Sequence, residues 1–194
     1  MNAYTTVNIL DMIEAIGEEN VRIFLSDFSC PKNQEIENFV TKNAIEFAKK
    51  KMSITHLIIN ENGKLAAIFT LTHKAIEIFD KGLSNTNRKR IQRYAQLNEE
   101  SRCYSVSAFL IAQFGKNYSE KENVLLSGNS LMESAMTILS VVQHDIGGGI
   151  VYLECEDNEK LLTFYQNEHN CFRPFGERYS EVDQTKYIQL VRFF

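Results

Sequence analysis

The sequence predicts an α/β fold in which one mixed sheet and its helices form a single domain over residues 1–194. Two patterns lead to this prediction. Residues 54–72 are two β-rich runs around an Asn-Gly turn, which is the signature of a β-hairpin. Residues 103–165 alternate between strand, loop, helix, strand and helix patterns, as α/β folds do. A chain of 194 residues is long enough for one buried core and does not require two domains.

The N-terminal third predicts two helices. Residues 7–16 carry apolar side chains at helical spacing, and this helix should stop at Gly17. The run V-R-I-F-L, residues 21–25, predicts a strand or an extended segment. Asn33 is the predicted N-cap of the second helix, whose apolar stripe runs over residues 36–48.

The second half predicts a longer strand and a helix between strands. Residues 103–114 are aromatic and β-branched, and they predict a central strand. Residues 131–142 form an amphipathic helical pattern that ends near the glycines 147–149. Residues 150–155 are almost continuously apolar, which is typical of a buried parallel strand. Two closing strands are expected over residues 170–175 and 185–193.

Composition excludes several classes of protein. An apolar fraction of 44% and a charged fraction of 24% are typical of a globular chain. No apolar run approaches the ~18 residues of a membrane span, and no basic segment precedes the first apolar residues, so we expect a cytoplasmic protein without membrane contact. The four cysteines lack metal-ligand spacing, which indicates reduced thiols and no metal. The net charge of −4 argues against nucleic acid as a partner.

One basic run interrupts this acidic background. The sequence N-R-K-R-I-Q-R, residues 87–93, contains four of the 21 Lys and Arg residues. We expect it to be a solvated helix face or a contact to a small acidic partner.

The stretch V-L-L-S-G-N-S, residues 124–130, places a glycine where a strand-side loop enters a helix. A glycine here lets backbone N–H groups point at an anion, and the helix N-terminus adds partial positive charge. The alternative is a glycine that the loop needs for structural reasons. The stretch lacks the glycine spacing of a Walker loop or a dinucleotide fingerprint, so it gives no support to nucleotide hydrolysis or hydride transfer.

Asn158 and Tyr165 stand seven residues apart in a helical pattern. On a continuous helix, positions i and i+7 differ by only about 20° around the axis, so both side chains should face the same way. One interpretation is a site in which Asn158 holds a ligand and Tyr165 handles a proton. The other is that Tyr165 belongs to the core and Asn158 is an exposed first-turn residue.

The order of these elements and motifs resembles the GNAT acyl-CoA N-acetyltransferases over most of the chain, in particular the bacterial GNATs that include toxin-type acetyltransferases. The resemblance rests on F-S-C at residues 28–30 with the hairpin that follows, on F-L-I-A-Q-F-G-K at 109–116, and on N-x6-Y at 158–165. It ends at Cys171-Phe172, where the family usually shows Gly-Phe. The family's pyrophosphate motif, Q/R-x-x-G-x-G/A, reads L-L-S-G-N-S here and keeps Gly128.

The resemblance implies a mostly antiparallel sheet with flanking helices and splayed central strands. It also implies acetyl-CoA as co-substrate. Pantetheine would bond to strand backbone, the pyrophosphate would lie on amides at a helix start, Asn158 would bind the pantetheine arm, and Tyr165 would protonate the CoA thiolate. The implied backbone contacts are Phe114, Gly115 and Lys116 for pantetheine, and Gly128, Asn129, Ser130 and Leu131 for the pyrophosphate.

The function implied is an acetyl-CoA-dependent N-acetyltransferase that acts on a primary amine of a small molecule or peptide. A toxin-type aminoacyl-tRNA acetyltransferase and a non-catalytic acyl-CoA-binding module are the alternatives. The sequence does not choose the general base, for which Glu77, His73, Glu154 and Tyr104 are candidates. It leaves room for a homodimer.

Overall fold

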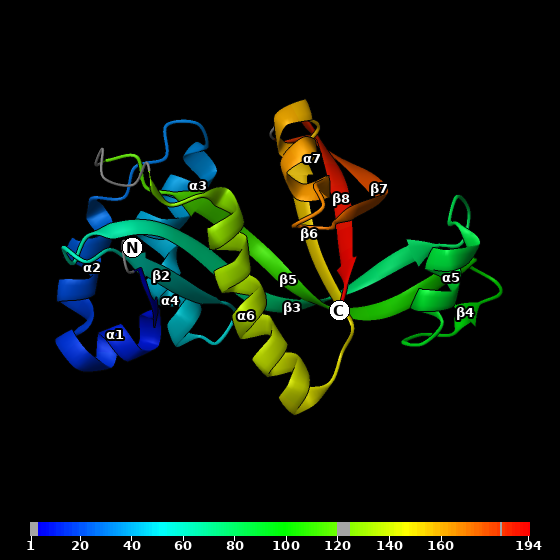
Figure 1. Ribbon diagram of the computed structural model, residues 1–194, viewed down its shortest axis with the longest axis horizontal. Coiled ribbons are helices and arrows are strands. Elements are labelled where there is room, and N and C mark those ends of the chain that lie inside the picture. The colour runs from blue at the N-terminus through cyan, green and yellow to red at the C-terminus, as the bar shows by residue number, and fades with distance from the viewer. Residues whose placement is uncertain (1–3, 120–124, 183) are drawn as a thin grey trace. The chain divides into compact units, whose positions relative to one another are not determined.

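The computed structural model describes residues 4–119, 125–182 and 184–194 (Figure 1). The chain divides into two compact units, which we call unit 1 (Met1–Thr72 with Ile111–Met136) and unit 2 (His73–Leu110 with Thr137–Phe194). Strands β3 (Leu65–Phe79) and β5 (Cys103–Lys116) and helix α6 (Gly128–Ile146) each contribute to both units. That the units together form one domain stays a prediction.

Unit 1 contains the predicted hairpin. Strand β2 (Ile54–Ile59) pairs antiparallel with the first half of β3, and β1 (Thr5–Asn8) pairs antiparallel with the outer side of β2. Strand β5 is the neighbour of β3 on its other side. At the turn, Asn60 accepts hydrogen bonds through its side chain from two backbone amides, and Gly63 adopts a φ of +73°. The predicted hairpin is therefore confirmed, and its turn is fixed locally by the Asn60 side chain and the left-handed backbone of Gly63.

The helices of unit 1 pack on this sheet. They are α1 (Ile9–Ile16), α2 (Glu18–Ser26), α3 (Gln34–Asn38), the π-helical segment η1 (Phe39–Asn43) and α4 (Ala44–Lys49). Figure 1 shows α1 and α4 beside β2, with which both are in contact. The predicted cap is confirmed, because the side chain of Asn33 accepts from the amide of Ile36 at 3.1 Å.

The predicted strand over residues 21–25 is wrong, because these residues lie in α2. Val21 and Leu25 are both buried, and their i, i+4 spacing puts them on one helix face. On the other side, Arg22 donates to Glu18 at 2.8 Å, again four residues apart. The five-residue run fits strand and helix patterns equally well, and packing decides for the helix.

Unit 2 adds the C-terminal strands. Besides the second half of β3 and the first half of β5, its elements are α5 (Asn85–Ile91), β4 (Leu97–Asn98), the end of α6, β6 (Ile150–Glu156), α7 (Glu159–Gln166), β7 (Arg173–Ser180) and β8 (Thr185–Phe193). The strand order is β3-β5-β6-β8-β7, with β4 paired to β5. Strands β5 and β6 are parallel, as predicted, and β8 is antiparallel to both its neighbours. The predicted mixed, mostly antiparallel α/β fold is confirmed.

A buried carboxylate anchors the basic run in unit 2. Asp80 accepts from Arg88 at 2.6 Å and from Arg102 at 2.8 Å, and these guanidinium groups hold the pKa of Asp80 below its usual range. The backbone amide of Asp80 also donates to the carbonyl of Arg102 at 2.9 Å. Arg88 is therefore partly buried in an ion pair, so the predicted solvated face does not include it.

Across the described parts of the chain, no helix is both long and apolar enough to span a bilayer.

His56 is a buried titratable group in unit 1. It is 7% exposed on β2, and its ring stacks on Phe69 with centroids 5.1 Å apart. Burial lowers the pKa of His56 to about 4, and the nearby Asp11 carboxylate opposes part of that shift. An unfolded histidine titrates near pH 6.5. Between these values the unfolded chain binds more protons, so acid removes stability as the pH falls from about 6.5 towards 4.

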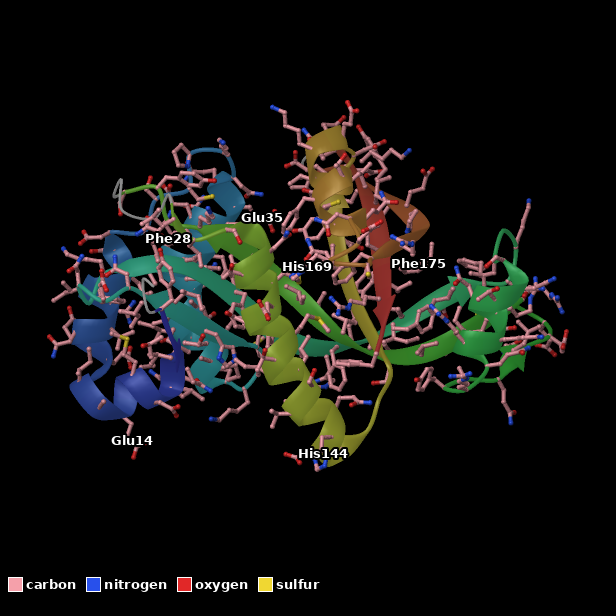
Figure 2. All side chains as sticks on the ribbon, in the orientation of Figure 1. Glu14, Phe28, Glu35, His144, His169 and Phe175 are labelled. Carbon is pink, nitrogen blue, oxygen red and sulfur yellow. The ribbon has the colours of Figure 1, made fainter. Side chains whose placement is uncertain are left out.

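We predict that lowering the pH from 7.5 to 5 destabilises the protein by up to about 2 kcal/mol through this histidine. The His56→Leu variant should lose that part of the pH dependence, because it has no proton to bind. Urea unfolding at the two pH values measures the effect. His144→Leu is the matched control, because His144 is exposed at the end of α6 (Figure 2). Equal pH dependence in the parent and in His56→Leu would contradict the prediction.

Candidate functional site

The end of β5 in unit 1 is closely packed at Gly115. A Cβ placed on this residue would lie 3.2 Å from Cγ2 and 3.5 Å from Cδ1 of Ile36, and 3.9 Å from the ring of Phe28. Phe28, in the F-S-C motif, lies in the loop between α2 and α3 (Figure 2). Glycine at 115 thus allows α3 to approach the strand. The residues on either side of Gly115, Phe114 and Lys116, are the other two predicted pantetheine contacts. Both are half-buried, and burial lowers the pKa of Lys116.

Directly after β5, the buried side chain of Asn117 joins three segments of unit 1. It accepts from the amide of Ser29 at 2.9 Å and from the amide of Ser119 at 3.1 Å, and it donates to the carbonyl of Leu65 at 2.9 Å. Only 2% of the residue is exposed. Sequence reasoning missed Asn117, because asparagine after a strand is an ordinary turn residue and its partners are distant in the chain.

The predicted anion-binding residues form the first turn of α6, in unit 1. Ser127 caps this helix: its hydroxyl accepts from the amide of Ser130 at 3.0 Å, and its carbonyl accepts from the amide of Leu131 at 3.1 Å. Two of the four predicted amides therefore have a partner within the turn. Gly128 and Asn129 precede them at the helix start. Val124, the first residue of the quoted stretch, lies outside the described residues.

In unit 2, Asn158 caps α7. Its side-chain carbonyl accepts from the amide of Lys160 at 3.0 Å, and its backbone is extended, with φ −131° and ψ 125°. Asn158 is exposed, whereas Tyr165 is 8% exposed. The expectation that the two side chains face the same way by helical spacing is not met, because Asn158 precedes the helix instead of lying in it.

Tyr165 packs between aromatic rings. Its ring centroid lies 4.9 Å from that of Phe164 and 6.0 Å from that of Phe172, both nearly edge-on. Burial raises the pKa of Tyr165, and Cys155 nearby adds to the shift. The phenol therefore stays protonated at neutral pH. A core tyrosine and a proton donor both agree with this geometry, so the assigned roles of Tyr165 and Asn158 stay predictions.

The turn after α7 explains the departure from the family's Gly-Phe. Cys171 has a φ of +59°, in the left-handed region that glycine adopts most easily. The amide of Cys171 donates to Asn167 at 2.9 Å, and the amide of Phe172 donates to the carbonyl of Tyr165 at 3.0 Å. The glycine-like conformation is thus kept without the glycine. Strand β7 begins two residues later, at Arg173, and not at residue 170 as predicted.

Among the candidate bases, Glu154 is tied into a polar network on β6, β7 and β8. Arg178 donates to its Oε2 from Nε at 3.1 Å and from Nη2 at 2.7 Å. The Tyr152 hydroxyl donates to Oε1, and Gln189 donates to the same oxygen at 3.0 Å. The desolvation of Glu154 opposes ionisation, but these hydrogen bonds outweigh it and lower the pKa to about 2. A carboxylate this acidic is a poor proton acceptor.

The other candidates differ in accessibility. Tyr104 is fully buried, with its hydroxyl 3.4 Å from Gln92 Nε2. His73 and Glu77 are exposed on β3. The general base is therefore not assigned. In the described residues, no group of His, Cys, Asp and Glu side chains is arranged to hold a metal ion.

No protein-family model matches the sequence, and no curated protein matches it. Solved structures do match. The chain is similar to AtaT complexed with acetyl-methionyl-tRNAfMet, with a TM-score of 0.65 and 13% identity over 95% of this chain and 94% of that one. It is similar to a tyrosine-to-phenylalanine mutant of KacT, with a TM-score of 0.62 and 13% identity over 96% and 94% of the two chains.

A third similar structure is the NatC complex bound to Gag peptide and CoA, with a TM-score of 0.52 and 10% identity over 100% and 98% of the chains. AtaT and KacT are GNAT-fold toxin acetyltransferases, and NatC is an N-acetyltransferase. The predicted resemblance to the GNAT fold is thereby confirmed over almost the whole chain.

We predict that Glu154→Gln lowers the free energy of unfolding by about 1–3 kcal/mol, because the charged partner of Arg178 is removed from a site where the Glu154 side chain is 17% exposed. Urea unfolding at pH 7 measures the loss. Glu177→Gln on β7 is the control, since Glu177 is 66% exposed in its pair with Lys186 and such surface pairs contribute little. Equal effects of the two changes would show that the Glu154 network adds no stability.

Proposed function

We propose that this protein is an acetyl-CoA-dependent N-acetyltransferase that acts on a primary amine. The observation that carries the proposal is the fold likeness to acetyltransferases, one of them solved with CoA, over 94–98% of their chains. Fold alone does not determine function, so the proposal also needs residues on which CoA could bind.

Unit 1 offers such residues for the pyrophosphate. Helix α6 is 19 residues long and starts at Gly128. The first amides of a helix point along its axis, and its dipole places partial positive charge at that end. We assign the pyrophosphate to the amides of Gly128, Asn129, Ser130 and Leu131. Its oxygens would then take over the amide of Ser130 from the Ser127 hydroxyl.

The pantetheine arm would follow the backbone of Phe114, Gly115 and Lys116, also in unit 1. The packing at Gly115 and the hydrogen bonds of Asn117 hold this strand end in one position. A site held in advance binds at a lower entropic cost. Asn158 uses its side-chain oxygen as a cap, and its amide nitrogen keeps two N–H donors for a pantetheine carbonyl.

In the proposed reaction, a neutral amine attacks the thioester carbonyl and forms a C–N bond. The tetrahedral intermediate then collapses and the C–S bond breaks. The amine proton goes to a base that is not assigned, and the departing thiolate takes a proton from the Tyr165 hydroxyl. The raised pKa of Tyr165 keeps that proton on the phenol until the thiolate forms.

A second candidate acceptor is the amino group of an aminoacyl-tRNA. The similar AtaT structure contains acetyl-methionyl-tRNAfMet, so the expectation that nucleic acid is not a partner is no longer supported. Radiolabelled acetyl-CoA with charged tRNA tests this candidate. Label should enter the tRNA fraction and leave it as N-acetyl amino acid after mild base, and uncharged tRNA should stay unlabelled.

The amine acceptor is identified by thiol release from acetyl-CoA across a panel of small amines, peptides and charged tRNA. Release with any member supports catalysis. Stabilisation by acetyl-CoA without release with any of them would instead favour a non-catalytic acyl-CoA-binding module.

We predict that Gly128→Asp abolishes thermal stabilisation by acetyl-CoA, because it adds a negative charge where the pyrophosphate binds. The measurement is the acetyl-CoA-induced shift in Tm. Ser140→Asp, which adds the same charge to an exposed position on α6, should keep the full shift. If Gly128→Asp is stabilised as well as the parent, the pyrophosphate binds elsewhere.

We predict that Tyr165→Phe lowers turnover at saturating substrates by about 10²–10⁴, the usual contribution of a placed general acid. The ring packing against Phe164 and Phe172 remains, so the variant should fold and bind CoA with unchanged Kd. Turnover, Kd and Tm are measured together. Tyr179→Phe, at an exposed position on β7, is the control. Unchanged turnover, or loss of the fold, would assign Tyr165 to the core instead.

A further inference from the structure

Positive charge is concentrated in one segment of unit 2. Residues 73–102 contain seven Lys and Arg and four Asp and Glu, a net charge of +3, whereas the whole chain carries −4. The net charge of −4 averages over this uneven distribution and therefore does not exclude nucleic acid as a partner. The local charge, and not the total, decides which partners a surface attracts.

The acidic residues of this segment neutralise only part of its positive charge. Asp80 pairs with Arg88 and Arg102, and Glu99 also pairs with Arg102. Lys89, Arg90 and Arg93 are exposed and have no carboxylate partner among the described residues. Figure 2 shows nitrogen-bearing side chains projecting around α5. Three cations are therefore available to an anionic partner.

Lys89 and Arg90 lie in the last turn of α5, and Arg93 and Tyr94 lie in the turn that follows it. The amides of Arg93 and Tyr94 donate to carbonyls three residues back, to Arg90 at 3.2 Å and to Ile91 at 2.8 Å. These bonds keep the chain coiled past the end of the helix, so the three cations and Tyr94 stay close together. Ile91, 1% exposed, marks the buried side.

The rings beside these cations are held in place and half-exposed. A Cβ on Gly149 would lie 1.9 Å from Cζ of Tyr94, so the tyrosine ring lies directly on the glycine backbone. The Gly149 carbonyl accepts from the amide of Phe194 at 3.2 Å. Tyr94 is 43% exposed and Phe194 40%. The guanidinium of Arg90 lies 5.4 Å above the ring of Phe193.

We infer that this surface, the α5 face (Lys89, Arg90, Arg93, Tyr94, Phe193 and Phe194), binds single-stranded nucleic acid. The cations would contact phosphates, and the exposed rings of Tyr94 and Phe194 would stack on bases, which is how strand-binding proteins combine charge with aromatic platforms. An acidic protein segment would use the cations but would have no need of fixed ring faces. The inference bears on the second candidate acceptor, the aminoacyl-tRNA, but it does not rest on acetyl transfer, because strand binding is measured without acetyl-CoA.

The first test is the salt dependence of binding. A fluorescent 12-nucleotide RNA of mixed sequence is titrated with the protein between 50 and 200 mM salt. The triple variant Lys89→Gln, Arg90→Gln, Arg93→Gln should reduce the slope of log K against log salt by about 2, and weaken binding near 0.1 M salt about 100-fold. The control Lys42→Gln, Lys50→Gln, Lys51→Gln removes the same charge from unit 1 and should bind like the parent.

The second test separates stacking from charge. Tyr94→Leu and Phe194→Leu should each weaken RNA binding about fivefold or more, with the salt slope unchanged, because a lost stacking contact involves no counterion. Tyr179→Leu removes an exposed ring from β7 and should have no effect.

Three results would overturn the inference. The first is no RNA binding at 50 mM salt, and the second is an equal loss of RNA affinity in the two triple variants. The third is a poly-glutamate peptide that binds more tightly than the RNA and whose affinity is unchanged by Tyr94→Leu. The last result would assign the face to an acidic protein. Stabilisation by acetyl-CoA is measured on the same variants and should not change. A parent that binds RNA but not acetyl-CoA would refute the proposed function and leave this inference intact.

Discussion

The end of β5 in unit 1 is the constraint on which the proposed cofactor site depends. At Gly115 a side chain would crowd Ile36, and two residues later Asn117 joins the loop at Ser29 to the start of β3. These contacts leave the strand end little freedom. A ligand that hydrogen-bonds to backbone groups needs a strand held in place in this way, because backbone donors and acceptors cannot adjust as side chains do.

The features that could be predicted from the sequence are those that neighbouring residues determine. The Asn-Gly hairpin, the Asn33 cap and the glycine stop after α6 each need only a few adjacent residues and a known backbone geometry. For residues 21–25 the local pattern gave a wrong prediction, because five residues fit both a helix and a strand. There the choice was made by burial of Val21 and Leu25 in the core of unit 1, which the local sequence does not contain.

The candidate site was less predictable because its residues obtain their environment from distant segments. The sequence shows the seven-residue spacing of Asn158 and Tyr165. Asn158 is a cap residue with an extended backbone, however, so helical spacing does not predict where its side chain points. Glu154 was a candidate base from the sequence, but in the fold Arg178, 24 residues away, and Gln189, 35 residues away, donate hydrogen bonds to it and lower its pKa. Charge behaves in the same way: a total of −4 conceals a basic segment on α5.

The turn at Cys171 has a practical consequence. Cys30, Cys103 and Cys155 are buried, whereas Cys171 is exposed and its Sγ lies 2.8 Å from the carbonyl of Glu168. A maleimide fluorophore or spin label should therefore react at one position without any cysteine being removed by mutation. That position follows the helix that bears Tyr165, so a spectroscopic signal from it would report on α7 in the unmodified sequence.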